Sequence, residues 1–147
     1  MKKNIAVIGC GYWGQNLVRN FSDLGALAAI CDPNAEIAKQ FAAQYNVNNL
    51  SFAQIINDEV IEGVVLAVPA PLHASLAIEA MMAGKHVYVE KPLAMNQIEA
   101  RQMIETSKDQ GVQLMVGHLL QYHPIFIALR ELVASGALGG LSYIYSN

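Results

Sequence analysis

The chain has 147 residues, a length that suits one ordinary domain, and its 54% hydrophobic and 14% charged residues favour a sheet covered on both faces over an antiparallel sheet with one wet face. The net charge of -3 and the scattered Lys and Arg residues argue against a nucleic-acid partner. No apolar run approaches the roughly 18 residues of a membrane span, so we expect no contact with a membrane.

The first predicted element is a strand at residues 5–8 that ends directly in a glycine-rich turn. Residues 5–8 form an apolar run typical of a strand buried on both faces, and Gly9, Gly11 and Gly14 follow in a G-x-G-x-x-G pattern. Gly9 permits a sharp turn, Gly11 has no Cβ to hold a pyrophosphate away from the backbone, and Gly14 lets the next helix pack closely. The phosphates of a dinucleotide are then expected at the amino terminus of a helix over about residues 12–24.

A second apolar run at residues 26–31 ends in Asp32, roughly the expected 20 residues beyond the glycines. A carboxylate here is suited to accept hydrogen bonds from the adenosine ribose and to repel a 2′-phosphate, which favours NAD over NADP as the cofactor. The alternative is a turn or helix-capping role for Asp32 before Pro33.

The remaining elements alternate between helix and strand with short connections. We expect helices at residues 33–45, 52–57, 69–82, 96–110 and 124–135, and strands at residues 49–51, 63–68, 86–89 and 112–116. The expected inward positions of the helices include Leu17, Val18, Phe21, Leu24, Ile37, Ala38, Phe41, Leu76, Ala77, Ala80, Met81, Ile98, Ala100, Met103 and Ile104. Six strands separated by helices predict an α/β fold, a Rossmann doubly wound parallel sheet of order 3-2-1-4-5-6.

The last segment has a different pattern. Residues 138–147 alternate apolar and polar positions, which is typical of a strand in a half-exposed sheet. We therefore divide the chain into a NAD-binding domain at residues 1–137 and, at residues 138–147, the first strand of a missing C-terminal substrate domain. The alternative is an edge strand of the first sheet. Because an exposed strand offers unpaired backbone groups, we also expect a homo-oligomer.

Four motifs at the predicted carboxyl ends of strands coincide in one family. They are the glycine turn at Gly9, residues 69–73 (PAPLH), residues 90–92 (EKP) and residues 117–118 (GH). With these motifs the whole chain resembles the Gfo/Idh/MocA family, named for glucose-fructose oxidoreductase, inositol dehydrogenase and rhizopine catabolism. Residues 117–124 and 141–147 resemble UDP-N-acetylglucosaminuronate 3-dehydrogenases within that family.

The resemblance implies an NAD(P)-dependent dehydrogenase that oxidises a hydroxyl of a sugar or sugar nucleotide by hydride transfer. It identifies Lys91 as the catalytic residue, and a lysine beside the reacting carbon can hold the hydroxyl and ease the loss of its proton. By residue type alone, Lys91 would be read as a solvated cation beyond a strand. The resemblance also implies that His73 faces the nicotinamide ribose, against the alternative that it points to solvent, and that His118 lines the substrate cleft, with a solvent-facing position as its alternative.

The expected cofactor contacts are Gly9, Gly11, Tyr12, Trp13, Gly14, Asp32, Pro69, His73 and Glu90, and the expected substrate contacts are Lys91 and His118. Two other functions stay open, an inositol or simple-sugar dehydrogenase and a non-catalytic NAD-sensing module. Lys91 favours an enzyme, because a sensor needs only the glycine turn and Asp32. Since the family completes its substrate site with a C-terminal domain, we expect the 147-residue chain alone to be inactive or nearly so.

Cysteine and histidine usage completes the expectations. Cys10 and Cys31 are expected to be free thiols near the ends of neighbouring strands, which indicates a reducing, cytoplasmic location. The four histidines have no metal-ligand spacing, so we predict no metal.

Overall fold

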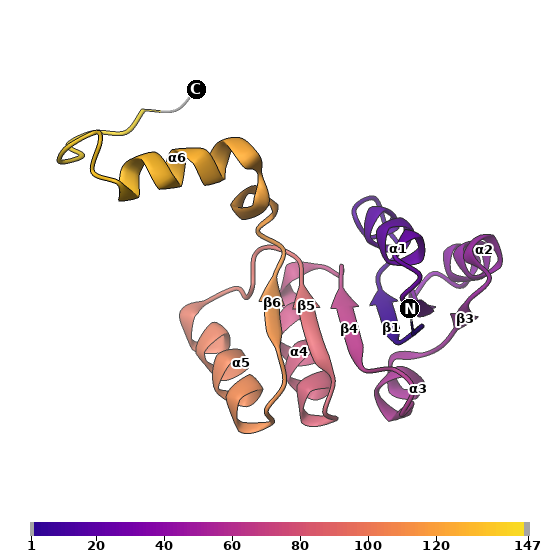
Figure 1. Ribbon diagram of the computed structural model, residues 1–147. Coiled ribbons are helices and arrows are strands. Elements are labelled where there is room, and N and C mark those ends of the chain that lie inside the picture. The colour runs from indigo at the N-terminus through magenta and orange to yellow at the C-terminus, as the bar shows by residue number, and fades with distance from the viewer. Residues whose placement is uncertain (1, 146–147) are drawn as a thin grey trace. The chain divides into compact units, whose positions relative to one another are not determined.

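The computed structural model describes residues 2–145 and divides into two compact units, Met1–Gly117 and His118–Asn147 (Figure 1). The strands of the first unit are β1 (Ile5–Ile8), β2 (Leu27–Cys31), β3 (Asn48–Asn49), β4 (Gly63–Leu66), β5 (His86–Val89) and β6 (Leu114–Val116). Its helices are α1 (Gly14–Asp23), α2 (Ala35–Tyr45), α3 (Phe52–Asn57), α4 (His73–Met82) and α5 (Gln97–Asp109), with the short 3-10 helix η1 (Ala70–Leu72) before α4.

The six strands form one parallel sheet in the order β3-β2-β1-β4-β5-β6, which confirms the predicted Rossmann topology. Ile8, the last residue of β1, pairs with Cys31 of β2 on one side and with Leu66 of β4 on the other. The three central strands therefore end at the same level. The turns that follow them lie together at the carboxyl edge of the sheet, where the strand order reverses and ligands of such folds bind.

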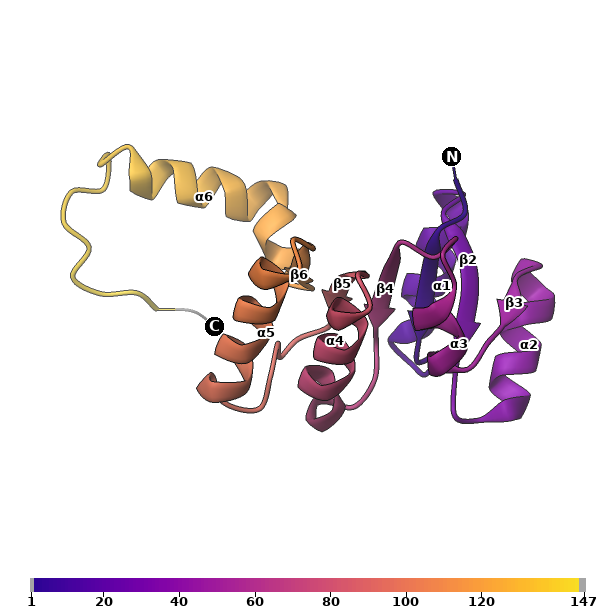
Figure 2. The ribbon, with the colours of Figure 1, turned by 90° about the horizontal axis from the view of Figure 1, so that it is seen from below.

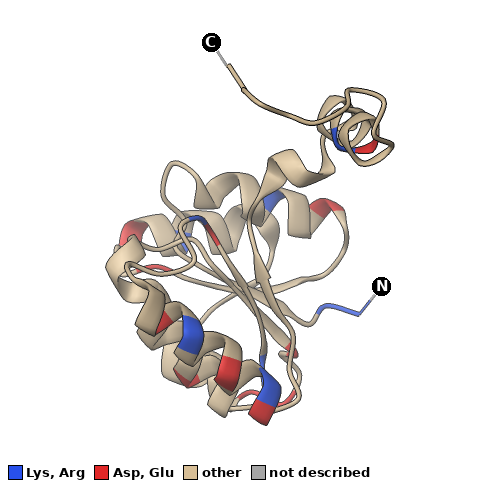
Figure 3. Ribbon diagram, turned by 90° about the vertical axis from the view of Figure 1, so that its left-hand side faces the viewer, with Lys and Arg blue, Asp and Glu red and all other residues tan. Residues whose placement is uncertain are grey.

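Helices cover both faces of the sheet, and each layer has its own apolar core (Figures 1 and 2). On one face, α1 and α2 pack against the strands through residues such as Val18, Ile30 and Val65. On the other face, α3, α4 and α5 pack through residues such as Ile55 and Met81. The strands carry no Lys, Arg, Asp or Glu, and Figure 3 shows these residues on helices and on the segments between the elements.

Local sequence signals account for most helix starts. Asn34 caps α2, Asn96 caps α5, and Ser51 forms a reciprocal capping box with Gln54 at the start of α3. Each side-chain oxygen accepts a backbone N–H that lacks a partner within its helix.

Three predicted inward positions are wrong. Leu24 is 57% exposed because it lies at the C-cap, beyond the last turn of α1. Ile98 and Ile104 of α5 are 71% and 41% exposed, whereas Met103 is fully buried. Helix α5 covers the β6 end of the sheet and buries only a narrow stripe, so positions at the edge of the predicted face remain in solvent.

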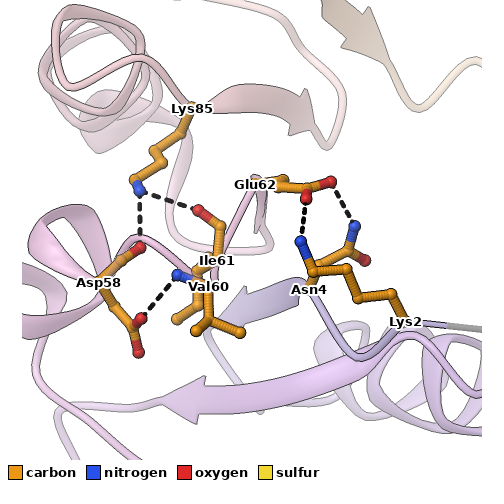
Figure 4. A network of polar contacts seen from close by, with 7 residues as sticks. All are labelled: Lys2, Asn4, Asp58, Val60, Ile61, Glu62 and Lys85. Carbon is orange, nitrogen blue, oxygen red and sulfur yellow. Dashed lines mark hydrogen bonds and ion pairs between the residues drawn. The ribbon is translucent and has the colours of Figure 1, made fainter.

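Polar contacts fasten the amino edge of the sheet (Figure 4). The buried Lys85, next to the start of β5, donates from Nζ to the carbonyl oxygens of Asp58 and Ile61 at 2.8 Å each. Nearby, the exposed carboxylate of Glu62 accepts hydrogen bonds from Lys2 and Asn4, and these bonds lower the pKa of Glu62. The loop between α3 and β4 is thus tied to its neighbours at the edge opposite the glycine turn.

The second unit contains the 3-10 helix η2 (Leu119–Tyr122) and α6 (Pro124–Ala134). The described residues 139–145 have no regular secondary structure, so the strand predicted at 138–147 is not formed there, and Ser146 and Asn147 lie outside the described residues. A lone segment has no neighbouring strand to satisfy its backbone groups. None of the described helices has the length and apolarity needed to cross a membrane.

Candidate cofactor and active site

The glycine turn after β1 has a backbone geometry that explains the glycines at two of its three positions. Gly9 has a φ of 92°, and a Cβ at that position would collide with the carbonyl of Ala67. A Cβ on Gly14 would collide with the backbone of Gly9, so the turn and the start of α1 are in direct contact. By contrast, a Cβ on Gly11 would have no atom within 4 Å. Gly11 therefore leaves open space beside the backbone, which fits the close approach of a pyrophosphate.

Asp32 is connected to the same turn. Its Oδ2 accepts a hydrogen bond from the backbone N–H of Cys10 at 2.7 Å, and its Oδ1 accepts one from the N–H of Asn34 at 2.8 Å. The carboxylate is half-buried at the end of β2. It holds the turn and still has lone pairs available for the hydroxyls of a ribose.

Asp32 lines an open cavity of about 470 Å³, together with residues that the sequence analysis did not assign to the site. Besides Cys31 to Pro33, its walls include Asn49, the last residue of β3, and Leu50 and Phe52, which come after it. Because β3 pairs with β2, the residues after both strands meet at one edge. The predicted strand order already placed β3 beside β2, and that pairing could have identified these lining residues. Asp32 thus lies in the wall of an open cavity, and its contact with an adenosine ribose stays a prediction.

A second open cavity, of about 270 Å³, brings the other predicted groups together. Trp13 lines it from the glycine turn, Ala67 and Val68 from the end of β4, and Glu90 and Lys91 from the end of β5. Lys91 is exposed and follows directly after the buried Glu90. Lys91 thus lines the same cavity as Trp13 of the glycine turn.

Glu90 is held by a small group of neighbours. It is 6% exposed, Tyr88 donates from its hydroxyl to Oε1 at 3.0 Å, and the backbone N–H of Lys91 donates to Oε2 at 3.3 Å. A Cβ at Gly117 would meet both the Tyr88 hydroxyl and the Glu90 carboxylate, so a larger residue there would force these side chains to move. Sequence reasoning missed Tyr88, and it did not anticipate that Gly117 makes room for Glu90.

His73 is buried, which excludes the solvent-facing alternative, and its contact with the nicotinamide ribose stays a prediction. The ring is 1% exposed, its Nδ1 lies 2.7 Å from the carbonyl oxygen of Pro92, and its Nε2 lies 2.9 Å from that of Val68. The ring therefore points neither to solvent nor into the cavity lined by Trp13 and Lys91. Each ring nitrogen faces a backbone carbonyl oxygen, and it donates to that oxygen only when it carries a hydrogen. The peptide bond between Lys91 and Pro92 is cis.

The remaining predicted site residues lie at the surface. Tyr12 is 87% exposed and Pro69 is exposed at the start of η1. His118 is exposed at the start of the second unit. Their proposed contacts stay predictions. Within residues 2–145, no three or more His, Cys, Asp or Glu side chains gather in a way that would hold a metal ion.

Two free thiols lie beside the glycine turn. Burial raises the pKa of Cys10 to about 12, and the negative charges of Asp32 and the Cys31 thiolate add to the shift. Burial also raises the pKa of Cys31. Both thiols are therefore neutral at physiological pH, and neither is set up as a nucleophile.

Comparisons with known proteins agree with this geometry. The model of the GFO/IDH/MocA oxidoreductase family, NAD-binding Rossmann fold, matches residues 3–118. An uncharacterized oxidoreductase of Streptococcus pneumoniae is 30% identical over 95% of this chain and 38% of its own length. The UDP-N-acetylglucosamine 3-dehydrogenase of Acidithiobacillus ferrooxidans is 30% identical over 85% of this chain and 40% of its own length.

Solved structures give the same result. A structure of that Acidithiobacillus enzyme superposes with a TM-score of 0.82 at 29% identity, covering 87% of this chain and 42% of its own. A putative myo-inositol dehydrogenase of Sinorhizobium meliloti superposes with a TM-score of 0.84 at 26% identity, covering 92% and 42%. The chain thus spans less than half the length of these relatives. It belongs to the GFO/IDH/MocA oxidoreductase family and is an NAD-binding Rossmann domain of that family.

Proposed function

We propose that this chain is the cofactor-binding part of a dehydrogenase that oxidises a hydroxyl of a sugar or sugar nucleotide, with Lys91 as its catalytic residue. The observation that carries the proposal is the shared cavity, in which Trp13 of the glycine turn and Lys91 after β5 are both wall residues. A dinucleotide that begins at the turn and extends over the end of β4 would place its nicotinamide beside this lysine.

The residues divide the chemistry between them. When bound, the nicotinamide would accept a hydride from the carbon that carries the hydroxyl. The hydroxyl must also lose a proton, and Lys91 would hold its oxygen by a hydrogen bond and ease that loss. Glu90 would keep the backbone of Lys91 in place, since its carboxylate accepts the Lys91 N–H.

NAD rather than NADP is the proposed cofactor. Asp32 places a carboxylate at the end of β2, where it would accept hydrogen bonds from ribose hydroxyls and repel a 2′-phosphate. We expect NADH to bind more tightly than NADPH in a titration of Trp13, which is the single tryptophan of the chain and a wall residue of the cavity. Equal or tighter binding of NADPH would overturn this assignment.

The substrate class rests on the relatives. Their names include a UDP-N-acetylglucosamine 3-dehydrogenase and a putative myo-inositol dehydrogenase. We propose a sugar nucleotide, with an inositol or a simple sugar as the second candidate. These relatives have more than half of their length outside the matched part, so the 147-residue chain alone is expected to bind NADH and turn over little or no substrate.

The decisive experiment compares Lys91→Met with wild type in the complete gene product. NAD⁺ reduction is followed by absorbance with UDP-N-acetylglucosamine, its uronic acid, myo-inositol and glucose. Loss of the lysine should lower turnover by about 100-fold to 10,000-fold and change the NADH Kd by less than about threefold. Lys108→Met, an exposed lysine in the last turn of α5, is the matched control. Near-normal turnover of Lys91→Met would contradict the proposed role.

Assembly and location are proposed on separate grounds. Exposed apolar side chains of α6, among them Ile125, Leu129 and Leu132, support a homo-oligomer, and analytical ultracentrifugation measures its mass. The free thiols of Cys10 and Cys31 support a cytoplasmic location, which cell fractionation checks.

A further inference from the structure

His73 is a buried polar side chain that the proposed chemistry does not use. It is the first residue of α4, it is 1% exposed, and it does not line the cavity that contains Lys91. Burying an imidazole is costly unless its polar atoms find partners, so the two partners indicate what the ring does.

Both partners belong to the two strand ends that form the cavity wall. Val68, whose carbonyl oxygen lies 2.9 Å from Nε2, follows β4 and lines the cavity itself. Pro92, whose carbonyl oxygen lies 2.7 Å from Nδ1, comes directly after Lys91. A single rigid ring therefore connects the end of β4 to the loop that presents the lysine.

Contacts on both sides of Lys91 hold its backbone. Its own N–H donates to the Glu90 carboxylate at 3.3 Å, and the carbonyl of the next residue faces the His73 ring. Its side chain, in contrast, is exposed. The backbone of Lys91 is thus fixed while its ammonium group remains available to a ligand in the cavity.

We propose that His73 is a positioning residue, which fixes Lys91 against the cofactor cavity through the hydrogen bond from Nδ1 to the Pro92 carbonyl. This inference rests on the proposed function, because it assumes that Lys91 meets the nicotinamide end of the dinucleotide. A carbonyl oxygen only accepts, so the bond exists when Nδ1 carries a hydrogen. A neutral imidazole carries one N–H, so the contact between Nε2 and the Val68 carbonyl oxygen is a hydrogen bond only when Nε2 carries the hydrogen, and it does not by itself hold the lysine.

Two amide variants separate the two bonds. An asparagine amide can place an N–H donor near the position of Nδ1, and a glutamine amide can place one near that of Nε2. His73→Asn should therefore keep Lys91 in place, whereas His73→Gln and His73→Ala should release it. Ser75→Ala is the matched control, since the Ser75 hydroxyl donates to the Leu72 carbonyl at the same end of α4.

The readout is the protection of Lys91 from acetylation by bound NADH, measured by mass spectrometry of the 147-residue chain. Each variant is saturated to the same occupancy, set by its own Kd from Trp13 fluorescence. The exposed Lys39 and Lys108 give the reference labelling rates. At about 90% occupancy, wild type, Ser75→Ala and His73→Asn should label Lys91 about tenfold more slowly than without NADH, and His73→Gln less than about twofold more slowly.

The possible outcomes distinguish an error in the His73 inference from an error in the proposed role of Lys91. If NADH protects Lys91 equally in wild type and in both amide variants, the His73 inference is wrong and the proposed function stands. If NADH binds to wild type but does not protect Lys91, the proposed role of Lys91 fails, and the inference fails with it. A purely structural histidine would lower the melting temperature of both amide variants without changing protection at equal occupancy. If His73→Ala does not fold, the difference in Lys91 protection between His73→Asn and His73→Gln still tests the inference.

Discussion

Asp32 and Cys10 are joined by a 2.7 Å hydrogen bond from the Cys10 backbone N–H to the Asp32 carboxylate, across the ends of β2 and β1. The acidic residue that is expected at the cofactor ribose is therefore also part of the scaffold of the glycine turn. Substitutions at Asp32 act on both.

Asp32→Ala should weaken NADH binding by about 10-fold to 100-fold, or about 1.4 to 2.7 kcal/mol, because the ribose loses its acceptor and the turn loses one of its hydrogen bonds. Fluorescence titration of Trp13 measures the Kd. Asp23→Ala, an exposed acid at the end of α1, is the control and should bind like wild type. Unchanged binding by Asp32→Ala would leave Asp32 with only the capping role.

The three glycines should respond differently to alanine. Gly11→Ala adds a methyl group into open space, so stability should change by less than about 0.5 kcal/mol, whereas NADH binding should fall at least about tenfold. Gly14→Ala drives a Cβ into the Gly9 backbone and should cost about 1 to 3 kcal/mol of stability. Urea denaturation and NADH titration of both variants separate the two effects. Full NADH affinity in Gly11→Ala would place the pyrophosphate elsewhere.

Cys10 should be inert in the folded chain. Burial raises its pKa to about 12 in the folded state, against an ordinary value of 9.0, so iodoacetamide at pH 8 should label it only after unfolding. The raised pKa means that the folded state retains a proton that the unfolded state releases above pH 9.0. This contribution to stability is complete below that pH and is lost as the pH rises toward 12.

The measurement for Cys10 is mass spectrometry of labelled peptides, followed by urea denaturation between pH 8 and pH 10.5. In Cys10→Ala the fall of stability above pH 9.0 should be shallower than in wild type. Rapid labelling of native Cys10 would mean that the thiol reaches solvent beside the glycine turn.

Lys85→Met should destabilise the fold without affecting the cofactor. The buried ammonium donates to the carbonyls of Asp58 and Ile61, and losing both bonds should cost about 2 to 3 kcal/mol. The NADH Kd should stay within about twofold of wild type, because Lys85 lies at the opposite edge of the sheet. Lys108→Met, an exposed lysine of α5, is the control for removing a positive charge. A variant as stable as wild type would show that water replaces the lost donor.

The sheet was predictable because each strand is marked by residues that are close together in the sequence. Each apolar run, such as residues 63–68, is bounded by glycine, proline or a polar cap, and alternation with helices permits few topologies. The residues of the glycine turn, Asp32 and Lys91 were found because a motif at a strand end fixes their place in the sheet. The burial of Ile98 was predicted wrongly, since helical periodicity does not show how much of a helix the sheet covers.

The support around the site was not predictable for a different reason. His73 meets the Val68 and Pro92 carbonyls, and Glu90 meets Tyr88 and the space left by Gly117. These partners are brought together by the packing of α4 and of β6 against β5, and no spacing along the chain encodes a ring orientation. Sequence reasoning identified Lys91 as the candidate catalytic residue and missed the contacts that hold its backbone.

Lys85 and its carbonyl partners have a consequence for how such a domain changes over time. They secure one rim of the sheet, while the cavities beside Asp32 and Lys91 lie at the other rim. A mutation of the exposed Lys91 therefore leaves these tethers intact, whereas a mutation of Asp32 or Gly14 also alters the glycine turn. A lineage built on this arrangement can vary the exposed positions around the cavities without loosening the opposite rim.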